Sequence, residues 1–289
     1  MQLRRIGSRH VSAIGLGEMP MSIEGRPDEA RSIETIHAAL DAGVTLIDTA
    51  DAYSLGGDDT GHGERLVAKA LSSWGGDRGS VLVATKGGHL RPGDGSWTVN
   101  GDPRYLRQAA EASLRRLGVE AIGLYQYHRP DPKVRYEDAV GVFKELLDAG
   151  KVLMVGISNA NVGQIDIARS VLGEGNLASV QNQFSPFFRS SEGELRYCGQ
   201  LGIAFLPWSP FGGIGNAEAL RREHPAFAHV AAEHGVSVHQ VVLAWMLAKG
   251  DHVVPIPGAS RPSSVLDCVA AVDLKLSEDE LALLDADRR

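Results

Sequence analysis

The stretch IETIHAALDAGVTLIDTADAY, residues 33–53, passes from a helix pattern to a strand pattern and decides the fold. Its apolar residues recur at helical spacing as far as Leu40, and Gly43 follows where a residue that tolerates positive φ is needed to close the last helical turn. The apolar run at residues 44–47 then predicts a buried strand that ends at Asp48. This stretch therefore predicts one helix that packs on one strand of a sheet.

The same alternation of helix and strand patterns continues along the chain. Nearly continuous apolar strands separated by amphipathic helices indicate a parallel sheet covered by helices, and eight such units close a (β/α)8 barrel. We therefore predict an α/β fold, a (β/α)8 TIM barrel, in a single domain spanning residues 1–289. The eight runs predicted as strands are residues 13–16, 44–47, 81–84, 122–125, 152–155, 178–180, 203–206 and 253–256.

Two further segments shape this prediction. A doubly wound sheet is the alternative, but it usually needs a GxGxxG turn after its first strand, and GLGEMP at residues 15–20 has only two glycines before a proline. Residues 3–6 and 11–13 flank a Gly7-Ser8 turn and predict an N-terminal β-hairpin that closes the bottom of the barrel. The glycine-rich stretch at residues 87–103 predicts a long loop over the active face.

Composition and charge exclude several classes of protein. The formal net charge is −7, and no run of lysine or arginine is long enough to follow a phosphate backbone, so nucleic acid is not an expected partner. Cys198 and Cys268 lack CxxC spacing, which favours reduced thiols and a cytoplasmic location. No apolar run suits a signal peptide or a membrane span. The sequence leaves the oligomeric state open.

Polar residues follow five of the predicted strands. In a (β/α)8 barrel, the carboxyl ends of the strands and the loops after them form the active face. Each residue alone has a structural interpretation: Asp48 as a helix cap, Tyr53 as a half-buried core residue and His128 as a hydrogen-bonded structural histidine. A lysine at the end of a buried strand needs a partner, because an unpaired buried ammonium is costly. The residues are Asp48 and Tyr53, Lys86, His128, Ser158 and Asn159, and Gln181.

Together these groups predict the reduction of a carbonyl. A carbonyl that accepts hydride develops oxyanion character and needs a proton donor, and tyrosine is a weak donor near neutral pH unless its pKa is lowered. Lys86 beside the phenol of Tyr53 would lower that pKa, and Asp48 would orient the lysine. His128 would hold the carbonyl oxygen, and the amide side chains would bind a nicotinamide carboxamide.

At these residues the sequence resembles the aldo-keto reductase family, over nearly the whole chain. The resemblance implies Tyr53 as general acid, Lys86 and Asp48 as the pair that tunes it, and His128 as the group that orients the carbonyl. The motifs that carry it are GLGEM at 15–19, DTADAY at 48–53, ATKGG at 84–88, HRPD at 128–131, GISN at 156–159, VQNQFSPFFR at 180–189, PWSPFGGIG at 207–215 and PIPGASR at 255–261.

The resemblance also implies a set of cofactor contacts. A guanidinium beside a hydroxyl suits the adenosine 2'-phosphate, so we expect NADPH to be preferred over NADH. The implied contacts are Gly17 and Met19, Ser158, Asn159 and Gln181 on the carboxamide, Phe184 stacked on the nicotinamide, Trp208, Ser209, Pro210 and Gly212 around the pyrophosphate, and Ser260 and Arg261 at the 2'-phosphate. On the adenine side Ser264 and Cys268 depart from the family pattern of Gln and Asn. The chain also lacks the long C-terminal tail of many members, so we expect a more open pocket.

The expected substrate is a small carbonyl compound, such as a polar or aromatic aldehyde, a ketone or a sugar-like carbonyl. Two alternatives remain. A metal-dependent hydrolase on the same barrel would need strand-end histidines paired as HxH, which are missing, so no metal is expected. An NADPH-holding redox sensor would keep the same residues and turn over slowly. The side chains expected to line the substrate pocket are Met19, His89, Trp97, Tyr127 and Arg129.

Overall fold

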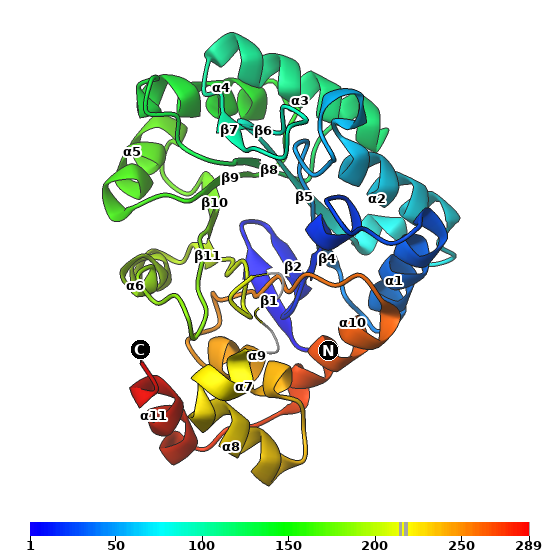
Figure 1. The fold of residues 1–289 in the computed structure, drawn as a ribbon. Helices are drawn as coiled ribbons and strands as arrows, with labels where there is room; N and C mark the ends of the chain where they lie inside the picture. The colour runs from blue at the N-terminus through cyan, green and yellow to red at the C-terminus, as the bar shows by residue number, and fades with distance from the viewer. Residues whose placement is uncertain (214–215, 217–218, 289) are drawn as a thin grey trace.

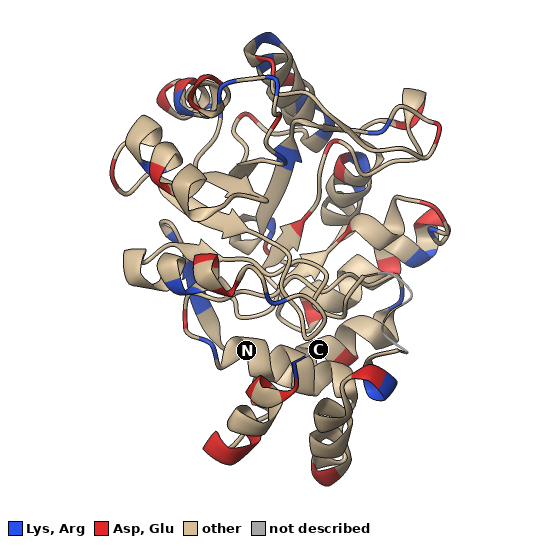
Figure 2. Ribbon diagram, turned by 60° about the vertical axis from the view of Figure 1, so that its left-hand side comes forward, with Lys and Arg blue, Asp and Glu red and all other residues tan. Residues whose placement is uncertain are grey.

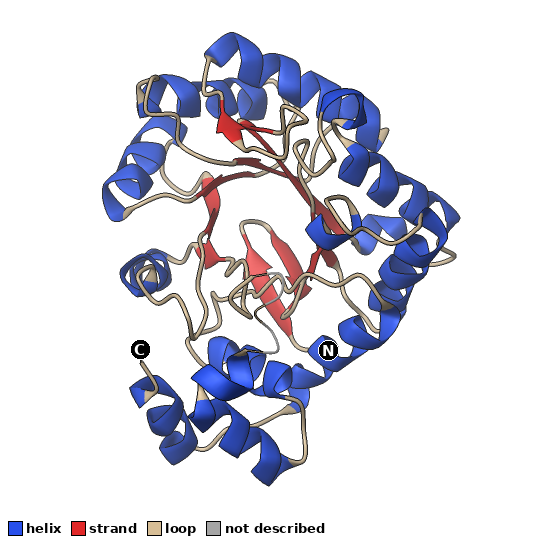
Figure 3. Cartoon of the chain, viewed as in Figure 1, coloured by secondary structure: helices blue, strands red, loops and turns tan. Residues whose placement is uncertain are grey.

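The fold is a parallel sheet curled into a barrel and covered by helices, as the computed structural model shows for residues 1–213, 216 and 219–288 (Figures 1 and 3). Seven strands follow the order β11-β10-β9-β8-β5-β4-β3, and every pairing among them is parallel. They are β3 (Leu16–Gly17), β4 (Leu46–Asp48), β5 (Leu82–Gly87), β8 (Leu124–Tyr127), β9 (Val155–Ser158), β10 (Leu177–Gln181) and β11 (Ala204–Phe205).

The helices surround this sheet on its outer side (Figure 3). They are α1 (Glu29–Asp41), α2 (His62–Ser73), α3 (Pro103–Leu117), α4 (Tyr136–Asp148), α5 (Val162–Leu172), α6 (Glu192–Leu201), α7 (Leu220–Glu223), α8 (Pro225–His234), α9 (Val238–Leu247), α10 (Pro262–Ala270) and α11 (Glu278–Ala286). Gly43 and Gly150, which follow α1 and α4, have φ of 90° and 70°. These positive values confirm that both helices close at a glycine.

Residues 253–258 close the barrel between its two edge strands. Isolated parallel bridges join Gly17 to Gly258 and Phe205 to Val253. The segment is not a regular strand because Pro255 and Pro257 have no N–H to donate to β3, although their carbonyls accept hydrogen bonds from the backbone of that edge. The predicted (β/α)8 barrel is confirmed, with seven regular strands and with residues 253–258 as the closing segment in the place of the eighth.

The predicted hairpin is also confirmed, as β1 (Leu3–Ile6) and β2 (Arg9–Ser12), joined at Gly7 with φ of 52°. The turn lies against the beginnings of two barrel strands, since a Cβ on Gly7 would come 2.8 Å from the sulfur of Met154 and 3.0 Å from Ala178. Strands begin at the bottom of a barrel and end at the top. The hairpin therefore closes the bottom, and Figure 1 shows it lying across the opening.

The barrel interior next to the hairpin is apolar. Ile6 and Val11 of the hairpin belong to the same buried cluster as inward-facing residues of the strands. Burying a side chain of this size contributes about 1.5–3 kcal/mol. The other residues of this cluster, which lie on the barrel strands, next to their ends or on the closing segment, are Leu46, Leu82, Ala84, Leu124, Met154, Ala178, Ala204, Leu206, Val254 and Ile256.

The glycine-rich segment after β5 contains more structure than expected. Residues 87–103 were predicted as a long loop over the active face, and β6 (His89–Leu90) and β7 (Thr98–Val99) form a short antiparallel hairpin within it. His89 on this hairpin lies 4.8 Å from the ring of His128, measured between ring centroids. The segment therefore does lie over the end of the barrel where the strands finish.

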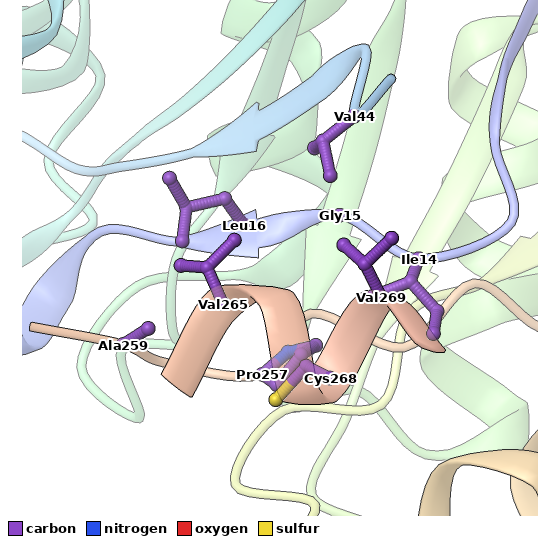
Figure 4. Close-up of a pocket in the computed structure, with 9 residues that line it drawn as sticks. All are labelled: Ile14, Gly15, Leu16, Val44, Pro257, Ala259, Val265, Cys268 and Val269. Atoms are coloured by element: carbon purple, nitrogen blue, oxygen red, sulfur yellow. The ribbon is translucent and has the colours of Figure 1, made fainter. Parts of the chain in front are cut away.

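The distribution of charged residues on the surface and the state of the two cysteines agree with what the sequence composition predicts. Figure 2 shows acidic and basic segments interspersed over the outer helices and loops. Cys198 and Cys268 are both free and buried. Cys268 lines a small apolar cavity of about 10 Å³ between α10 and the strands, shown in Figure 4, which is at the lower limit for holding one water molecule. Within the described ranges, no helix is long and apolar enough to cross a membrane.

Candidate active site

Four side chains from separate parts of the sequence meet at the top of the barrel. Asp48 is the last residue of β4, Lys86 is the next-to-last residue of β5, and His128 directly follows β8. Tyr53 lies in the loop after β4. The ammonium of Lys86 donates to Asp48 Oδ1 at 2.5 Å, to the Thr49 carbonyl at 2.9 Å and to Tyr53 Oη at 3.1 Å. All three donors of the fully buried lysine are thus used.

The second oxygen of Asp48 is held by two glutamines. Gln181 Nε2 donates to Asp48 Oδ2 at 2.8 Å, and Gln126 Nε2 donates to the same atom at 3.2 Å. Gln126 was not among the predicted site residues, although it lies two residues before His128 on β8. The inward-facing positions of a strand repeat every second residue, so this spacing was the available signal.

Burial and Lys86 act in opposite directions on Tyr53. Burial raises the pKa of the Tyr53 phenol above its usual value, and the Lys86 charge offsets this only in part. The net lowering expected from Lys86 is therefore wrong for the chain without ligand. Burial also acts to lower the pKa of Lys86, but Asp48 and Tyr53 outweigh it, so that pKa is raised and the lysine stays charged.

His128 is a neutral imidazole beside the phenol. Burial, with the charges of Lys86 and Arg129 and the neighbouring His89, lowers the pKa of His128 well below its usual range. The His128 and Tyr53 rings meet edge to face with 5.8 Å between centroids. His128 Nδ1 is buried and has no hydrogen-bond partner among the described residues. A neutral imidazole with spare hydrogen-bonding capacity suits a ligand oxygen.

Ser158 and Asn159 lie beside His128 and already bond to the protein. Ser158 Oγ donates to the Gln181 carbonyl at 2.7 Å, and Asn159 Nδ2 donates to the His128 carbonyl at 3.0 Å. Asn159 has a φ of 57°, which is uncommon for a residue other than glycine. The Asn159 side chain is held at the strand end by its bonds to His128 and Ser158. The Asn159 backbone N–H donates to the carbonyl of Gln181, whose side chain bonds to Asp48.

Two predicted site residues lie elsewhere. Tyr127 was expected in the pocket wall, but it is buried outside the barrel, 5.6 Å from the ring of Phe143 and 5.7 Å from that of Tyr136. Neighbouring residues of a strand point to opposite faces, so Tyr127 and His128 do not share one site. Phe184 was expected to stack on the nicotinamide, but it is fully buried and stacks on Trp245 at 5.3 Å.

Trp208 is the aromatic side chain that packs on the apolar cluster inside the barrel. It is half-buried, and its Nε1 is buried without a partner in the part of the chain that the structure describes. Ser209 and Gly212 follow with φ of 51° and 84°. A Cβ on Gly212 would clash with the ring of Phe187, so packing within the protein already requires glycine there. Pro210 is buried within the same loop, and the final Ile214 and Gly215 of the predicted motif lie outside the described residues.

The predicted 2'-phosphate contacts lie at the start of α10. Arg261 is the N-cap residue of this helix and is exposed, and its Nε donates to Ser264 Oγ at 2.8 Å. Ser260 precedes it and is half-buried. A helix N-terminus with an exposed guanidinium and nearby hydroxyls suits an anion. Cys268, two turns along α10, faces the small apolar cavity rather than solvent.

Gly17 and Met19 lie at the seam of the barrel. A Cβ on Gly17 would come 2.8 Å from the Ile256 carbonyl oxygen, so strand closure alone requires glycine there. Met19 begins a 3-10 helix (Met19–Met21) and is half-buried. The packing of the barrel seam therefore requires glycine at position 17. The sequence alone did not distinguish this structural role from a cofactor contact.

The remaining predicted pocket residues lie near His128. His89 stacks on Trp97 at 4.7 Å, and Arg129 Nη2 donates to Asn159 Oδ1 at 3.3 Å. Burial, with the charges of Arg129, Arg91 and Lys86, lowers the pKa of His89 to about 4. His89 therefore contacts both Trp97 and His128, while Arg129 is joined to the His128 backbone through Asn159.

A buried carboxyl group next to the site was missed. Glu18 is fully buried, accepts a hydrogen bond from Thr49 Oγ1 at 2.9 Å and bonds to Ser22, which in turn lies 2.8 Å from His62 Nδ1. Burial raises the pKa of Glu18 to about 7. The sequence placed Glu18 in the GLGEM motif, but its single charge gave no sign that it would be enclosed.

No cluster of metal-ligating side chains occurs in the described ranges 1–213, 216 and 219–288. The histidines considered for a metal site are spread over different elements. His37 bonds to the Ala70 carbonyl at 2.9 Å, and His62 to Ser22. The buried group around Lys86 is instead built for proton and charge interactions.

Comparisons with known proteins agree with this geometry. A profile described as Aldo/keto reductase family matches residues 13–288. An uncharacterized oxidoreductase of Schizosaccharomyces pombe is 34% identical over 97% of this chain and 88% of its own length. A protein named probable aldo-keto reductase 1, from Glycine max, is 33% identical over 94% of this chain and 84% of its own.

Solved structures give the same result. A glycerol dehydrogenase from Gluconobacter oxydans superposes with a TM-score of 0.83 at 28% identity, covering 99% of this chain and 94% of that one. An aldo/keto reductase from Klebsiella pneumoniae, solved with NADP and acetate, superposes with a TM-score of 0.79 at 27% identity, covering 97% and 93%. This chain therefore belongs to the aldo/keto reductase family, enzymes that are oxidoreductases acting on carbonyl compounds with a nicotinamide cofactor.

Proposed function

We propose that this protein reduces an aldehyde or ketone to an alcohol with NADPH, and that Tyr53 is the general acid. The observation that carries the proposal is the buried chain of bonds from Asp48 through Lys86 to the Tyr53 hydroxyl. An ammonium that is fully enclosed and touches a phenol has a role in stabilising negative charge on that phenol.

The protein residues then have distinct tasks. When bound, the nicotinamide supplies the hydride to the carbonyl carbon. Tyr53 Oη gives its proton to the carbonyl oxygen as negative charge develops there, and the product is the alcohol. This transfer is favourable even with the raised pKa of Tyr53, because an alkoxide is a far stronger base than a phenolate. Lys86 stabilises the phenolate that remains on Tyr53. Neutral His128 donates a hydrogen bond to the oxygen of the substrate carbonyl.

The cofactor would be held along the top of the barrel. The proposed contacts fit a dinucleotide in two places: the positive-φ backbone at Ser209 and Gly212, and the N-terminus of α10 with Ser260 and Arg261. Ser158, Asn159 and Gln181 would exchange their present bonds for those of the carboxamide. In place of Phe184, we propose that Trp208 offers its face to the nicotinamide, because it is the aromatic group that borders the barrel interior.

Two further points are part of the proposal. We propose that residues 1–289 act as one domain, since the barrel closes only when its first strand and residues 253–258 pair. The free, buried Cys198 and Cys268 support a cytoplasmic location.

The test is Tyr53→Phe, measured by NADPH consumption with a panel of aldehydes and ketones. We expect kcat to fall by about 10²–10⁴-fold, the usual contribution of a general acid, with NADPH affinity little changed and tighter than NADH affinity. Tyr197→Phe is the matched control, because the Tyr197 hydroxyl bonds to Asp166 on the exposed surface, away from Lys86. Full activity of the Tyr53 variant would assign the proton to another group, and no turnover by the native protein would favour the redox-sensor alternative.

A further inference from the structure

Three cationic side chains lie near the top of the barrel on the side of His128, and only two are neutralised. Lys86 pairs with Asp48. Arg91 pairs with Glu24 and also lies over the ring of Trp97 at 4.3 Å. Arg129 forms no ion pair with any residue that the structure describes, although the chain has 36 acidic residues and a net charge of −7.

The guanidinium of Arg129 is half-buried and poorly satisfied. Its Nε is buried and makes no hydrogen bond among the described residues, and its bond from Nη2 to Asn159 Oδ1 is long, at 3.3 Å. Burial lowers the pKa of Arg129, and no acidic neighbour offsets that effect. Buried N–H groups without partners are costly, and those of a charged group most of all. The side chain therefore has capacity for an acceptor that the protein does not supply.

Arg129 also lies next to the groups that face the proposed carbonyl. It directly follows His128, and its charge lowers the pKa of both His128 and His89. The His128 ring lies 4.8 Å from that of His89 and 5.8 Å from that of Tyr53. An acceptor bound to Arg129 would thus lie beside the two imidazoles that border the proposed carbonyl site.

The chemistry of such an acceptor follows from its surroundings. The imidazoles of His89 and His128 are neutral at ordinary pH, so the nearest uncompensated charge is positive. A guanidinium presents its two Nη groups as a planar fork that matches the two oxygens of a carboxylate. The side chain is half-exposed, and this end carries Nη1, which makes no hydrogen bond among the described residues, and Nη2, whose bond to Asn159 is long, so a small molecule at the barrel top can reach it.

On this basis, and resting on the proposed carbonyl reduction, we propose that Arg129 is a specificity-determining residue that binds the carboxylate of an anionic substrate. The substrate class is an aldehyde or ketone that also carries a carboxylate, with the carbonyl at Tyr53 and His128 and the acid group at the Arg129 fork.

The experiment compares the ortho, meta and para isomers of carboxybenzaldehyde with their methyl esters, which differ in charge but share the reacting group. In Arg129→Gln we expect kcat/KM for at least one acid to fall by about 10- to 100-fold, as for loss of a charge-assisted bidentate contact, while its ester changes by less than about threefold. Arg129→Lys should recover only part of the loss, because an ammonium lacks the fork.

Two controls separate this from other effects. Arg135→Gln removes a neighbouring but exposed arginine that pairs with Asp138, and should leave both substrate classes unchanged. NADPH affinity is measured by fluorescence titration in each variant. A weaker NADPH affinity in Arg129→Gln, with equal losses for acids and esters, would mean that the guanidinium serves the cofactor and would overturn the proposal. Equal activity of the native protein and Arg129→Gln on all three acids would also overturn the proposal.

Binding without turnover keeps this inference separate from the proposed function. The carboxybenzyl alcohols are titrated calorimetrically into Tyr53→Phe and into Tyr53→Phe/Arg129→Gln, both with NADP⁺ present. Tighter binding to the first protein supports the carboxylate site even if no aldehyde is reduced by the native enzyme. Identical affinities in the two proteins, alongside normal reduction of benzaldehyde, would reject the carboxylate site and leave the carbonyl reductase intact.

Discussion

The bottom and the top of the barrel are built from the same strands but differ in chemistry. Leu46 and Asp48 lie two residues apart on β4 and both face inward, as do Leu124 and Gln126 on β8. The lower members of these pairs pack against the hairpin in an apolar cluster. The upper members form the hydrogen-bonded group around Lys86.

This difference teaches how one interior serves two purposes. The lower half contributes apolar burial, which stabilises the fold in proportion to the area removed from water. The upper half encloses charged groups, whose desolvation costs about as much as their mutual attraction returns. The change from one to the other takes only two residues on each strand, so the site is held in place by the core immediately below it.

The largest effect is expected from making the top resemble the bottom. In Lys86→Met the buried Asp48 loses its cation, which should lower stability by about 3–5 kcal/mol and abolish detectable reduction. In the double variant Asp48→Leu/Lys86→Met both buried charges are removed, so stability should recover part of that loss, while activity stays absent. The recovery is incomplete because the Gln126 and Gln181 amides lose Asp48 as their acceptor. Urea unfolding and NADPH consumption measure the two quantities.

Lys69→Met is the control for the lysine change, since Lys69 pairs with Glu29 on the exposed surface. It should alter neither stability nor rate appreciably. If the double variant is as unstable as Lys86→Met, then the polar group contributes to the fold through more than charge balance, and the division between the two halves is not as sharp as the clusters indicate.

A smaller effect is expected from loosening the bottom. Ile6→Ala removes a buried side chain of the hairpin and should cost about 2–4 kcal/mol, because an interior cavity is left beneath the strands. The NADPH-dependent rate of the folded fraction should change little, since Ile6 makes no contact with the Lys86 group. Leu3→Ala, on the exposed side of β1, is the matched control. A large fall in kcat with unchanged stability would show that the two halves are coupled.

The smallest effect concerns the pH dependence at the edge of the polar half. Burial raises the pKa of Glu18 from 4.5 to about 7, so the native state holds its proton in a range where the unfolded chain has lost it. The stability that this provides is complete below pH 4.5 and is lost as pH rises through about 7. It amounts to about 3 kcal/mol at most.

Glu18→Gln should remove this part of the pH dependence, as measured by urea midpoints on both sides of that window. Lys86 and Asp48 are the charged groups nearest to Glu18, and they remain in the variant. Glu29→Gln on the exposed side of α1 should leave the native curve as it is. A Glu18 variant with the native curve would mean that the carboxyl group stays ionised in the fold.

The sequence predicted the barrel well because its signals are local. Each apolar run lies within three residues of a strand or of the closing segment, and the hairpin was placed through the single turn at Gly7. Asp48, Lys86 and His128 were found because they interrupt apolar runs at strand ends, and Tyr53 because it follows Asp48 in the next loop. Those predictions needed only the order of residues and the general rule that parallel strands finish on one side.

The errors have two origins: a local rule that was not applied, and surroundings that are set by distant parts of the chain. Tyr127 was placed in the pocket without applying the alternation of strand faces, which Gln126 and His128 obey. Phe184 depends on Trp245, more than sixty residues away, and no local pattern links them. Asp51 was not among the predicted site residues, but it is buried, with its pKa raised well above the usual value by burial and by Glu64.

The prolines of the closing segment have a consequence for strand alignment. The amides of Val254 and Ile256 donate to the carbonyls of Phe205 and Pro207, while Pro255 and Pro257 face the other neighbour. If the segment slid by one position, both prolines would turn toward Phe205 and Pro207 and neither could donate. The missing amides thus penalise misalignment more than they weaken the native pairing, and they help to lock the shear of the whole cylinder.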